Sequence, residues 1–337
     1  MGTVIQLKNQ INNSYFDLKN SVEEKLILVE EKIKTKLTSD VNLVQKMTEY
    51  HIKTGGKKLR ALLTLGSAKL CGYSKGGRDI NLAACVELIH SATLLHDDVI
   101  DVSDVRRGKK TNNHIWGNKS SILAGDYLLS RCFEMMVEDG NLEILKLLSS
   151  TSAKIAQGEI LQLQHKGEVD MLEETYLKII SAKTASLFAT ATKVGSVLAN
   201  KENKIKEALE FYGKNLGLTF QIADDTLDYN SELKFFGKKI GNDFYEGKVT
   251  LPIIILYQKA SANEKIEIKK LFEKDKRSEE ELKRILLMIK NYNIISDCYI
   301  KAEYFINLAS NSLSIFDESK EKEILKNLTS FSLERSY

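Results

Sequence analysis

The sequence predicts an all-α fold, a single large helical bundle that spans residues 1–337 as one domain. Apolar residues recur at the three-to-four spacing of amphipathic helices along nearly the whole chain. The 337 residues include one proline, Pro252, where average usage would give roughly 17. No linker, low-complexity tract or fixed repeat marks a domain boundary. A genome rich in A and T is an alternative cause of the low proline content, because 41 of the 49 basic residues are lysine.

Each helix is expected at a distinct stretch of this pattern. Near the N-terminus, helical spacing links Leu18, Val22, Lys25, Leu26, Val29, Ile33 and Leu37. Long, largely apolar helices are expected at 78–101, 117–139, 141–165, 172–199 and 203–230, and shorter, more charged ones at 263–333, such as 279–289. Breaks are expected at Gly55, Gly56, Gly76, Gly77, Gly108, Gly140, Gly167 and Gly237. Pro252 fits the first turn of a helix within the β-branched run 249–257. Helices that are apolar nearly all round must lie inside a large bundle.

Composition and charge exclude several classes of protein. The formal charge of +3 is nearly balanced, which predicts no general affinity for nucleic acid or for a membrane surface. No apolar run approaches the roughly 20 residues of a spanning helix, and the first residues lack a signal-peptide pattern. The widely spaced cysteines are expected to be buried free thiols in a reducing compartment: Cys71, Cys85, Cys132 and Cys298. We therefore expect a soluble cytoplasmic protein.

Three acidic residues close the helix expected at 78–101. Asp97 and Asp101 are four positions apart, so both carboxylates lie on one helix face, about 6 Å apart along its axis. Asp98 adds a third negative charge beside them. Like charges at the end of an apolar helix are costly, so something positive must compensate them. Hard oxygen ligands favour Mg²⁺, which combines one or two carboxylates with substrate phosphates. The alternative is a solvated acidic helix end.

The same spacing recurs at the end of the helix expected at 203–230, in Asp224, Asp225 and Asp228. A second acidic helix end makes the solvated alternative harder to sustain. If the two clusters face each other, they would hold several Mg²⁺ ions around an anionic ligand, and diphosphate fits that description.

Cations accompany these acids in two places. Arg106 and Arg107 follow the first acidic cluster, although the chain has only eight arginines. Their planar guanidinium groups suit phosphate oxygens, whereas the alternative is a surface pair bridged to nearby acids. Lys57 and Arg60 follow Gly55–Gly56 at a helix start, where backbone N–H groups also favour anions. No Walker A loop or dinucleotide fingerprint is present in the sequence.

Together these motifs resemble the trans-type (class I) polyprenyl diphosphate synthase family, most closely its bacterial octaprenyl branch. The resemblance covers the chain from about residue 10 to its end. The matching segments are Gly55–Arg60, His90–Asp101, Arg106–Gly108, Lys183–Thr184, Gln221–Asp228 and Gly237–Pro252. The resemblance implies a bundle of the isoprenoid synthase type with a central active-site cavity.

The resemblance also implies roles for individual residues. A cluster of three Mg²⁺ ions would be held by Asp97, Asp101, Asp224 and Asp228, with Asp98 and Asp225 in support. The allylic diphosphate would contact Arg106, Lys183, Thr184, Gln221, Lys248 and Lys238, the last favoured over Lys239 because Gly237 precedes it. Isopentenyl diphosphate would contact Lys57, Arg60, His90 and Arg107. The catalytic set is Asp97, Asp98, Asp101, Lys183, Asp224 and Asp225.

The implied reaction is ionisation of the allylic diphosphate, attack by the double bond of isopentenyl diphosphate, and loss of a proton. Ala92 and Thr93 lie about one turn before Asp97, and their small side chains predict an open pocket for the growing chain. A farnesyl primer and an octaprenyl product for quinone side chains are expected. Shorter (farnesyl, geranylgeranyl) or longer (solanesyl, decaprenyl) products are the alternatives. A homodimer is implied, and the hydrophobic product allows peripheral membrane contact.

Other classes of protein stay open. A class I terpene cyclase also uses an Asp-rich helix, but the Lys57 and Arg60 cradle and the second acidic cluster argue against it. A His-Asp phosphohydrolase would need further ligands, and His51, His114 and His165 have no convincing setting. His96 is expected to point away from the metal face. The remaining alternatives are a non-catalytic synthase subunit, which would typically lose one acidic cluster, and a helical scaffold.

Overall fold

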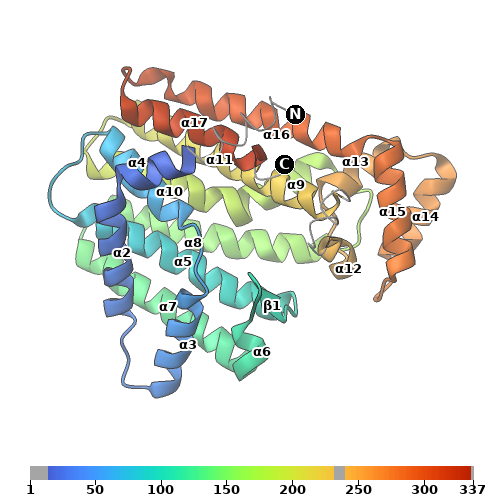
Figure 1. Cartoon of the computed structure of the whole chain (residues 1–337), viewed down its shortest axis with the longest axis horizontal. Coiled ribbons are helices and arrows are strands. Elements are labelled where there is room, and N and C mark those ends of the chain that lie inside the picture. The colour runs from blue at the N-terminus through green and yellow to red at the C-terminus, as the bar shows by residue number, and fades with distance from the viewer. Residues whose placement is uncertain (1–13, 231–239, 335–337) are drawn as a thin grey trace.

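The computed structural model describes residues 14–230 and 240–334, and this part of the chain is almost entirely helical (Figure 1). The all-α prediction is confirmed. The N-terminal half contains α2 (Glu23–Lys36), α3 (Asn42–Lys53), α4 (Leu59–Leu70), α5 (Arg78–Ile100), α6 (Asn112–Trp116), α7 (Asn118–Asp139) and α8 (Leu142–Gln164). The middle contains α9 (Glu173–Ile180), the π-helical turn η1 (Ser181–Ala185), α10 (Ser186–Leu198) and α11 (Asn203–Asp228). The rest contains α12 (Asn242–Glu246), α13 (Leu251–Lys259), α14 (Ala262–Phe272), α15 (Glu279–Asn291), α16 (Ile294–Ser312), the 3₁₀ turn η3 (Leu313–Ile315) and α17 (Lys320–Glu334).

The helix boundaries follow local signals in the sequence. Gly140 ends α7 with φ of 70°, a left-handed conformation that costs glycine little. Asn141 then caps α8, because its side chain accepts a hydrogen bond from the N–H of Ile144. Pro252 lies in the first turn of α13, where its missing N–H leaves no intrahelical bond unmade. The predicted break at Gly140 and the predicted place of Pro252 are both confirmed. The predicted break at Gly237 lies outside the described residues.

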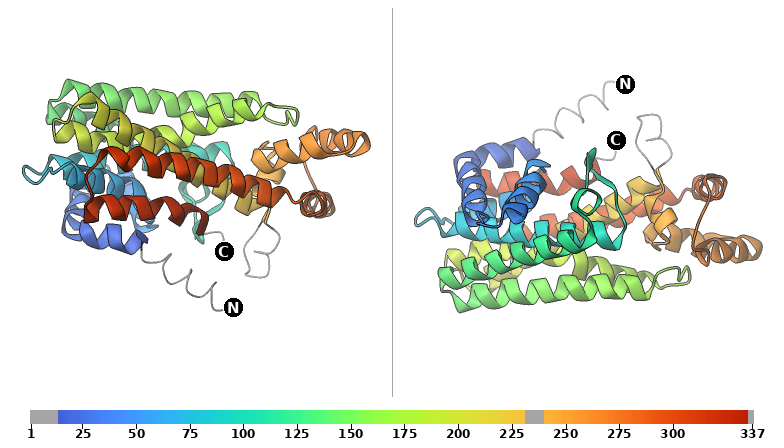
Figure 2. Two further views of the ribbon diagram at one scale, coloured as in Figure 1. Left: turned by 90° about the horizontal axis from the view of Figure 1, so that it is seen from above. Right: turned by 90° about the horizontal axis from the view of Figure 1, so that it is seen from below.

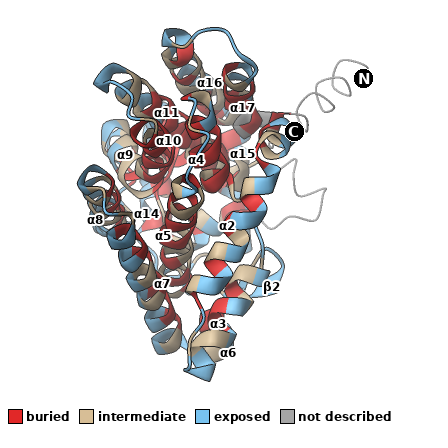
Figure 3. Cartoon of the chain, turned by 90° about the vertical axis from the view of Figure 1, so that its left-hand side faces the viewer, coloured by how far each residue is buried: buried red, intermediate tan, exposed pale blue. Residues whose placement is uncertain are grey.

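The centre of the bundle is formed by α4, α5, α10 and α11. Helix α10 packs against α4 and α11, and α5 packs against α4 and α7. Figure 3 shows buried residues concentrated in these inner helices, whereas the outward faces of α7 and α8 are exposed. Leu62, Leu88 and Phe188 are among the fully buried side chains. Burying a side chain of this size contributes about 1.5–3 kcal/mol, so the central helices supply much of the hydrophobic stabilisation.

Helix α11 connects two groups of buried apolar side chains. Leu209 and Tyr212, from its first half, join the main core with α4, α5, α7 and α10. Ile222 and Tyr229, from its second half, join a smaller core with α9 and α12–α16. Figure 2 shows α14 and α15 projecting from one end of the bundle. The acidic end of α11 therefore lies beside the smaller core.

Two local features differ from the sequence prediction. The helix expected over 172–199 is interrupted by the π-helical turn η1 at 181–185. A short hairpin contains the predicted break at Gly108, and in it β1 (Val105–Arg106) pairs antiparallel with β2 (Lys109–Lys110).

No helix in the described residues is long and apolar enough to cross a membrane. The four cysteines are free and buried, as predicted.

Candidate active site

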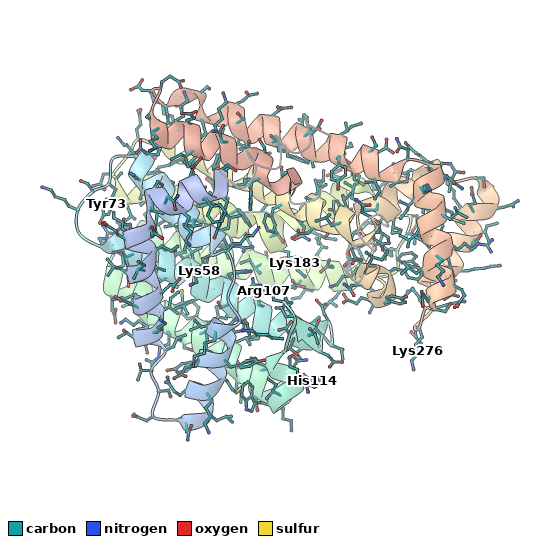
Figure 4. The ribbon with its side chains drawn as sticks, viewed as in Figure 1. Lys58, Tyr73, Arg107, His114, Lys183 and Lys276 are labelled. Atoms are coloured by element: carbon teal, nitrogen blue, oxygen red, sulfur yellow. The ribbon has the colours of Figure 1, made fainter. Side chains whose placement is uncertain are left out.

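A cavity of about 630 Å³ opens among the central helices. It is lined by eleven of the residues predicted from sequence: Lys57, Arg60, His90, Thr93, Asp97, Arg106, Arg107, Lys183, Thr184, Gln221 and Asp224. In Figure 4, the labelled side chains of Lys58, Arg107 and Lys183 come from three separate segments, and all three residues line this cavity. The remaining predicted residues lie outside its lining: Ala92, Asp98, Asp101, Asp225, Asp228 and Lys248. Lys238 lies outside the described residues.

Asp97 projects into the cavity from the last turn of α5. Burial raises the pKa of its carboxyl group to about 7, and the negative charges of Glu159 and Asp101 act in the same direction against the opposing charge of Lys183. A carboxylate whose charged form is so disfavoured gains much from a cation. The structure therefore places at Asp97 the oxygen donor that a metal ion or an ammonium group would stabilise.

The other two acids of this cluster are engaged by cations. Asp98 is buried, and its Oδ1 accepts a hydrogen bond of 2.7 Å from Nε of Arg106. Asp101 forms an ion pair with Lys248, with 2.9 Å between Oδ1 and Nζ. Burial opposes the positive charge of Lys248, yet the acids around it raise its pKa above the ordinary lysine value. Arg106 and Lys248, which were predicted to contact a diphosphate, thus also hold the first acidic cluster.

The second acidic cluster divides into three environments. Asp224 lines the cavity. Asp225 is buried, and its two oxygens accept hydrogen bonds from the O–H of Tyr176 and from Nε2 of Gln221, each at 2.7 Å. Burial nevertheless raises the pKa of Asp225 to about 7. Asp228 accepts backbone N–H bonds from Asn242 and Asp243, the first two residues of α12, so it caps the start of that helix. Only Asp224 of this cluster reaches the cavity lining.

The π-helical turn η1 carries Lys183 and Thr184, which both line the cavity. Lys183 is ion-paired with Glu159 and donates a hydrogen bond of 2.9 Å to Oε1 of Gln162. Thr184 donates one of 2.7 Å to Oε1 of Gln221. Single π-helical turns inside helices occur often at functional sites. Here the turn joins the cavity lining to the Tyr176–Asp225–Gln221 hydrogen-bond chain.

Helix α4 begins beside the glycine pair. Arg60 lies on its first turn, stacks on the ring of Phe188 at 4.5 Å, and has a buried Nε with no hydrogen-bond partner. Glu87 from α5 accepts the N–H of Ala61, so a carboxylate already occupies this helix N-terminus. A buried guanidinium nitrogen without an acceptor is costly and fits an anionic ligand such as a diphosphate oxygen.

The hairpin after α5 brings Arg107 to this glycine pair. Arg107 and Gly108 both have positive φ, 52° and 75°, as the two central residues of the tightest hairpin turns do. The guanidinium of Arg107 approaches Gly56 so closely that a Cβ there would lie 2.6 Å from it. Gly56 therefore combines a backbone conformation that favours glycine, with φ of 155°, and close contact with an arginine side chain, which the sequence pattern alone does not indicate.

Several cavity residues were missed by sequence analysis. His51, for which the sequence offered no convincing setting, lines the cavity, and burial together with Arg106 and Arg107 lowers its pKa to about 4. Glu87 and Glu159 also line it. These residues lie singly in amphipathic helices, so no local pattern marks them. His96 was expected to point away, and its Nε2 indeed lies 3.2 Å from the carbonyl oxygen of Ile122 on α7.

The two residues predicted to control chain length have different surroundings. Thr93 lines the cavity one turn before Asp97, as the helical spacing implies. Ala92 is fully buried in the main core and does not line the cavity. Of the two residues, only Thr93 therefore lies next to the cavity.

The donor set fits Mg²⁺ held jointly with a diphosphate. The candidate ligands are carboxylate oxygens, which Mg²⁺ prefers. Among the described residues, no three acidic, histidine or cysteine side chains lie close enough to form a complete metal site by themselves. Mg²⁺ usually takes one or two carboxylates and completes its coordination with waters and substrate phosphates. Asp97 and Asp224, on separate helices of one cavity, match that pattern.

Comparison with known proteins agrees with this geometry. The polyprenyl synthetase family model matches residues 41–289. An all-trans-nonaprenyl-diphosphate synthase (geranyl-diphosphate specific) of Rhodobacter capsulatus is 35% identical over 319 residues, which cover 95% of this chain and 97% of that protein. The octaprenyl diphosphate synthase of Escherichia coli is 43% identical over 218 residues, or 65% of this chain and 67% of that protein.

The fold also matches solved structures over nearly the whole chain. The crystal structure of a polyprenyl synthase from Caulobacter crescentus, complexed with calcium and isoprenyl diphosphate, matches with a TM-score of 0.91 at 37% identity. The match covers 96% of this chain and 98% of that one. From the family match, these relatives and the shared fold, we conclude that the chain belongs to the polyprenyl synthetase family and is a trans-polyprenyl diphosphate synthase, a prenyltransferase.

Proposed function

We propose that this enzyme extends an allylic diphosphate, with farnesyl diphosphate as primer, to octaprenyl diphosphate for quinone side chains. The observation that carries the proposal is the single cavity in which Asp97 and Asp224 face cations from α4, the hairpin and η1. Two anionic substrates need two groups of cations, and the cavity supplies both. Arg60 and Arg107 lie at the α4 end, and Lys183 lies at η1.

The chemistry requires charge stabilisation rather than a nucleophilic side chain. Bound Mg²⁺, for which we propose three ions, would stabilise the negative charge that develops on the departing diphosphate. Lys183, Arg106 and Lys248 orient that diphosphate so that the allylic C–O bond breaks. The isopentenyl double bond then forms the new C–C bond with the allylic cation. The proton lost from the isopentenyl unit leaves to the released diphosphate, and a trans double bond forms. Leu94, Ile155 and Phe220 on the cavity lining would help to keep water from the cation.

The proposed ligands and contacts are those that the family resemblance implies, and of the four ligands Asp97 and Asp224 line the cavity. Carboxylate ligands to Mg²⁺ are Asp97, Asp101, Asp224 and Asp228. The buried Asp98 and Asp225 act in support, because their oxygens already bond to Arg106, Tyr176 and Gln221. Thr184, Gln221 and Lys238 complete the allylic subsite. Lys57, Arg60, His90 and Arg107 form the isopentenyl subsite.

The octaprenyl product is supported by the small residue Thr93 beside Asp97 on the cavity lining. Thr93 is a small residue on the cavity lining, so the growing chain can pass it. The relatives include an octaprenyl and a nonaprenyl synthase, so products of neighbouring length are the close alternatives. We place the limit on chain length at Thr93 and the residues beyond it, with Ala92 acting through its packing.

The experiment is incubation of the purified protein with Mg²⁺, labelled isopentenyl diphosphate and either geranyl or farnesyl diphosphate, followed by chromatography of the products. An octaprenyl end product formed from farnesyl diphosphate supports the proposal. A product that stops at farnesyl or geranylgeranyl length would keep the chemistry but refute the open pocket. No incorporation by the folded protein would favour a non-catalytic subunit.

We also propose a homodimer through an apolar face on α7 and α8. Exposed large apolar side chains gather on these two helices: Ile122, Leu123, Phe133, Val137, Leu142, Ile160 and Leu163. Leu142 is 80% exposed and Val137 67% exposed, which is unusual for side chains of this kind in contact with water. Leu123→Glu together with Val137→Glu should convert a dimer into a monomer in light scattering. An unchanged mass would contradict this interface.

The two cores and the cysteines support the remaining proposals. Residues 1–337 act as one domain, because α11 contributes side chains to both cores. A cytoplasmic location agrees with four free, buried thiols, which are typical of a reducing compartment. Peripheral membrane contact would serve release of the hydrophobic product.

A further inference from the structure

Two aromatic rings, one near each end of the described part of the chain, lie beside the ammonium group of Lys57. The ammonium group lies 4.5 Å from the ring centroid of Phe331, near the end of α17, and 5.7 Å from that of Tyr15, in the helical segment before α2. The two rings stack at 5.5 Å with an interplanar angle of 19°. The O–H of Tyr15 also donates a hydrogen bond of 3.0 Å to the carbonyl oxygen of Lys57. Both the backbone and the side chain of Lys57 are therefore held.

Each ring is fixed by the core rather than by Lys57. On α17, Leu325 and Leu328 are buried, and the carbonyl oxygen of Leu325 accepts a hydrogen bond of 2.7 Å from the O–H of Tyr212. Near Tyr15, Leu18 is buried and packs so closely on α4 that a Cβ on Gly66 would lie 2.7 Å from it. The rings thus provide a preformed support for the lysine.

Lys57 lies on a loop whose backbone conformations are unusual. It follows two glycines with φ of 74° and 155°, and it precedes Lys58, whose φ is 48°. A lysine side chain on such a loop has many rotamers, and holding it in one place costs conformational entropy. A cation over an aromatic face is attracted by the ring quadrupole, so the rings offset part of that cost before a ligand arrives.

We propose that Tyr15 and Phe331 are positioning residues that hold Lys57 at the cavity wall for the diphosphate of isopentenyl diphosphate. The inference rests on the proposed function, which places Lys57 in the isopentenyl subsite. The segment before α2 and the end of α17 then act on one substrate subsite, and the ring of Phe331 sets the affinity for one of the two substrates.

The test compares Phe331→Leu, which removes the ring but keeps apolar bulk, with Phe331→Tyr, which keeps the ring. Leu325→Val is the matched control, because it loosens α17 without removing a group that touches Lys57. For each protein, the KM for isopentenyl diphosphate, the KM for the allylic diphosphate, kcat and Tm are measured.

Phe331→Leu is expected to raise the KM for isopentenyl diphosphate about fivefold, which corresponds to about 1 kcal/mol. The KM for the allylic diphosphate and kcat should stay within about twofold, and Phe331→Tyr should match the wild type. Tyr15→Leu should repeat the effect, and Leu325→Val should lower Tm alone. Unchanged KM values in Phe331→Leu, or a rise in both KM values that Leu325→Val reproduces, would overturn the proposal.

A second readout separates this inference from the proposed function. Acylation of Lys57 by an amine reagent, followed by mass spectrometry, reports on its side chain without any substrate. We call Tyr15 and Phe331, with their contacts to Lys57, the aromatic clamp. If the clamp holds Lys57, acylation should be faster in Phe331→Leu than in the wild type or Phe331→Tyr. If the wild type neither binds nor consumes isopentenyl diphosphate, the proposed function fails. The acylation rate of Lys57 still tests whether the two rings hold its side chain. Equal reactivity in all three proteins would reject the clamp itself.

Discussion

Replacement of Gly158 tests how the position of Lys183 is determined. Gly158 lies on α8 against the π-helical turn, and a Cβ built on it would lie 2.6 Å from the backbone nitrogen of Lys183. It would also lie 3.0 Å from Cβ of Ala182. Because the nearest atom belongs to the backbone, a rotamer change cannot relieve the contact. Gly158→Ala must therefore move η1 away from α8.

The size of the effect follows from that contact. Ordinary Cβ contacts begin near 3.4 Å, so the turn must shift by about 0.4–0.8 Å. Overpacking of this kind costs about 1–3 kcal/mol, and the better helix propensity of alanine returns about 1 kcal/mol. A misplacement of about 1 Å can cost a hundredfold in rate, so we expect kcat to fall about tenfold. Tm should fall by only a few degrees.

The assay is steady-state incorporation of isopentenyl diphosphate, with Gly66→Ala as the control. That substitution also adds a Cβ inside a helix, but it meets the far end of the Leu18 side chain and lies in the core rather than at the cavity. Gly66→Ala should change Tm without a matching loss of kcat. If Gly158→Ala keeps kcat within twofold of the wild type, close packing by α8 does not set the position of Lys183.

Four further predictions address the acids and the pocket. Burial and nearby acids raise the pKa of Asp97 to about 7, so a proton competes with Mg²⁺ for this carboxylate below that pH. At limiting Mg²⁺, kcat/KM should therefore rise with pH and reach a plateau above about 7. A kcat/KM profile that is flat from pH 5.5 to 8 would contradict this. The pKa values of Asp97 and Asp225 are raised in the folded state, so their contribution to the free energy of unfolding falls as pH rises from about 4 to 7. Tm should therefore fall over this pH range. The fall in Tm should be smaller when Mg²⁺ and diphosphate are present than when they are absent. Tyr176→Phe removes one hydrogen-bond donor to the buried carboxylate of Asp225 and should lower the free energy of unfolding in urea by about 1.5–3 kcal/mol. It should also raise the KM for the allylic diphosphate. An unchanged urea midpoint would show that the hydrogen bond is dispensable. Thr93→Phe should shorten the product on chromatography without abolishing the first condensation, and an unchanged product length would remove Thr93 from the growing chain's route.

Much of the fold was predictable because it depends on periodicity and on local breaks. Helices at 78–101 and 203–230 are marked by long apolar repeats, and the structure has α5 and α11 there within two residues at each end. The two acidic clusters were equally visible, since spacing of four places carboxylates on one helix face. That Asp97 and Asp224 share a cavity was a hypothesis about tertiary packing, which the structure supports.

The rest could not be read from local pattern because it depends on contacts between distant elements. The π-helical turn requires the close approach of Gly158 on another helix. Asp225 looks like its neighbour Asp224 in sequence, but Tyr176 and Gln221 occupy both of its oxygens. Ala92 shares a helix with Thr93, but only Thr93 lines the cavity.

The most direct test of the central claim compares Asp97→Asn, Asp224→Asn and the wild type in one assay. Each protein is given Mg²⁺, labelled isopentenyl diphosphate and farnesyl diphosphate, and Tm is recorded alongside. Because both carboxylates serve the same departing diphosphate, each single substitution should lower kcat by at least about a hundredfold with Tm retained. If either variant keeps wild-type turnover, the two acidic helix ends do not act together on one diphosphate in this cavity.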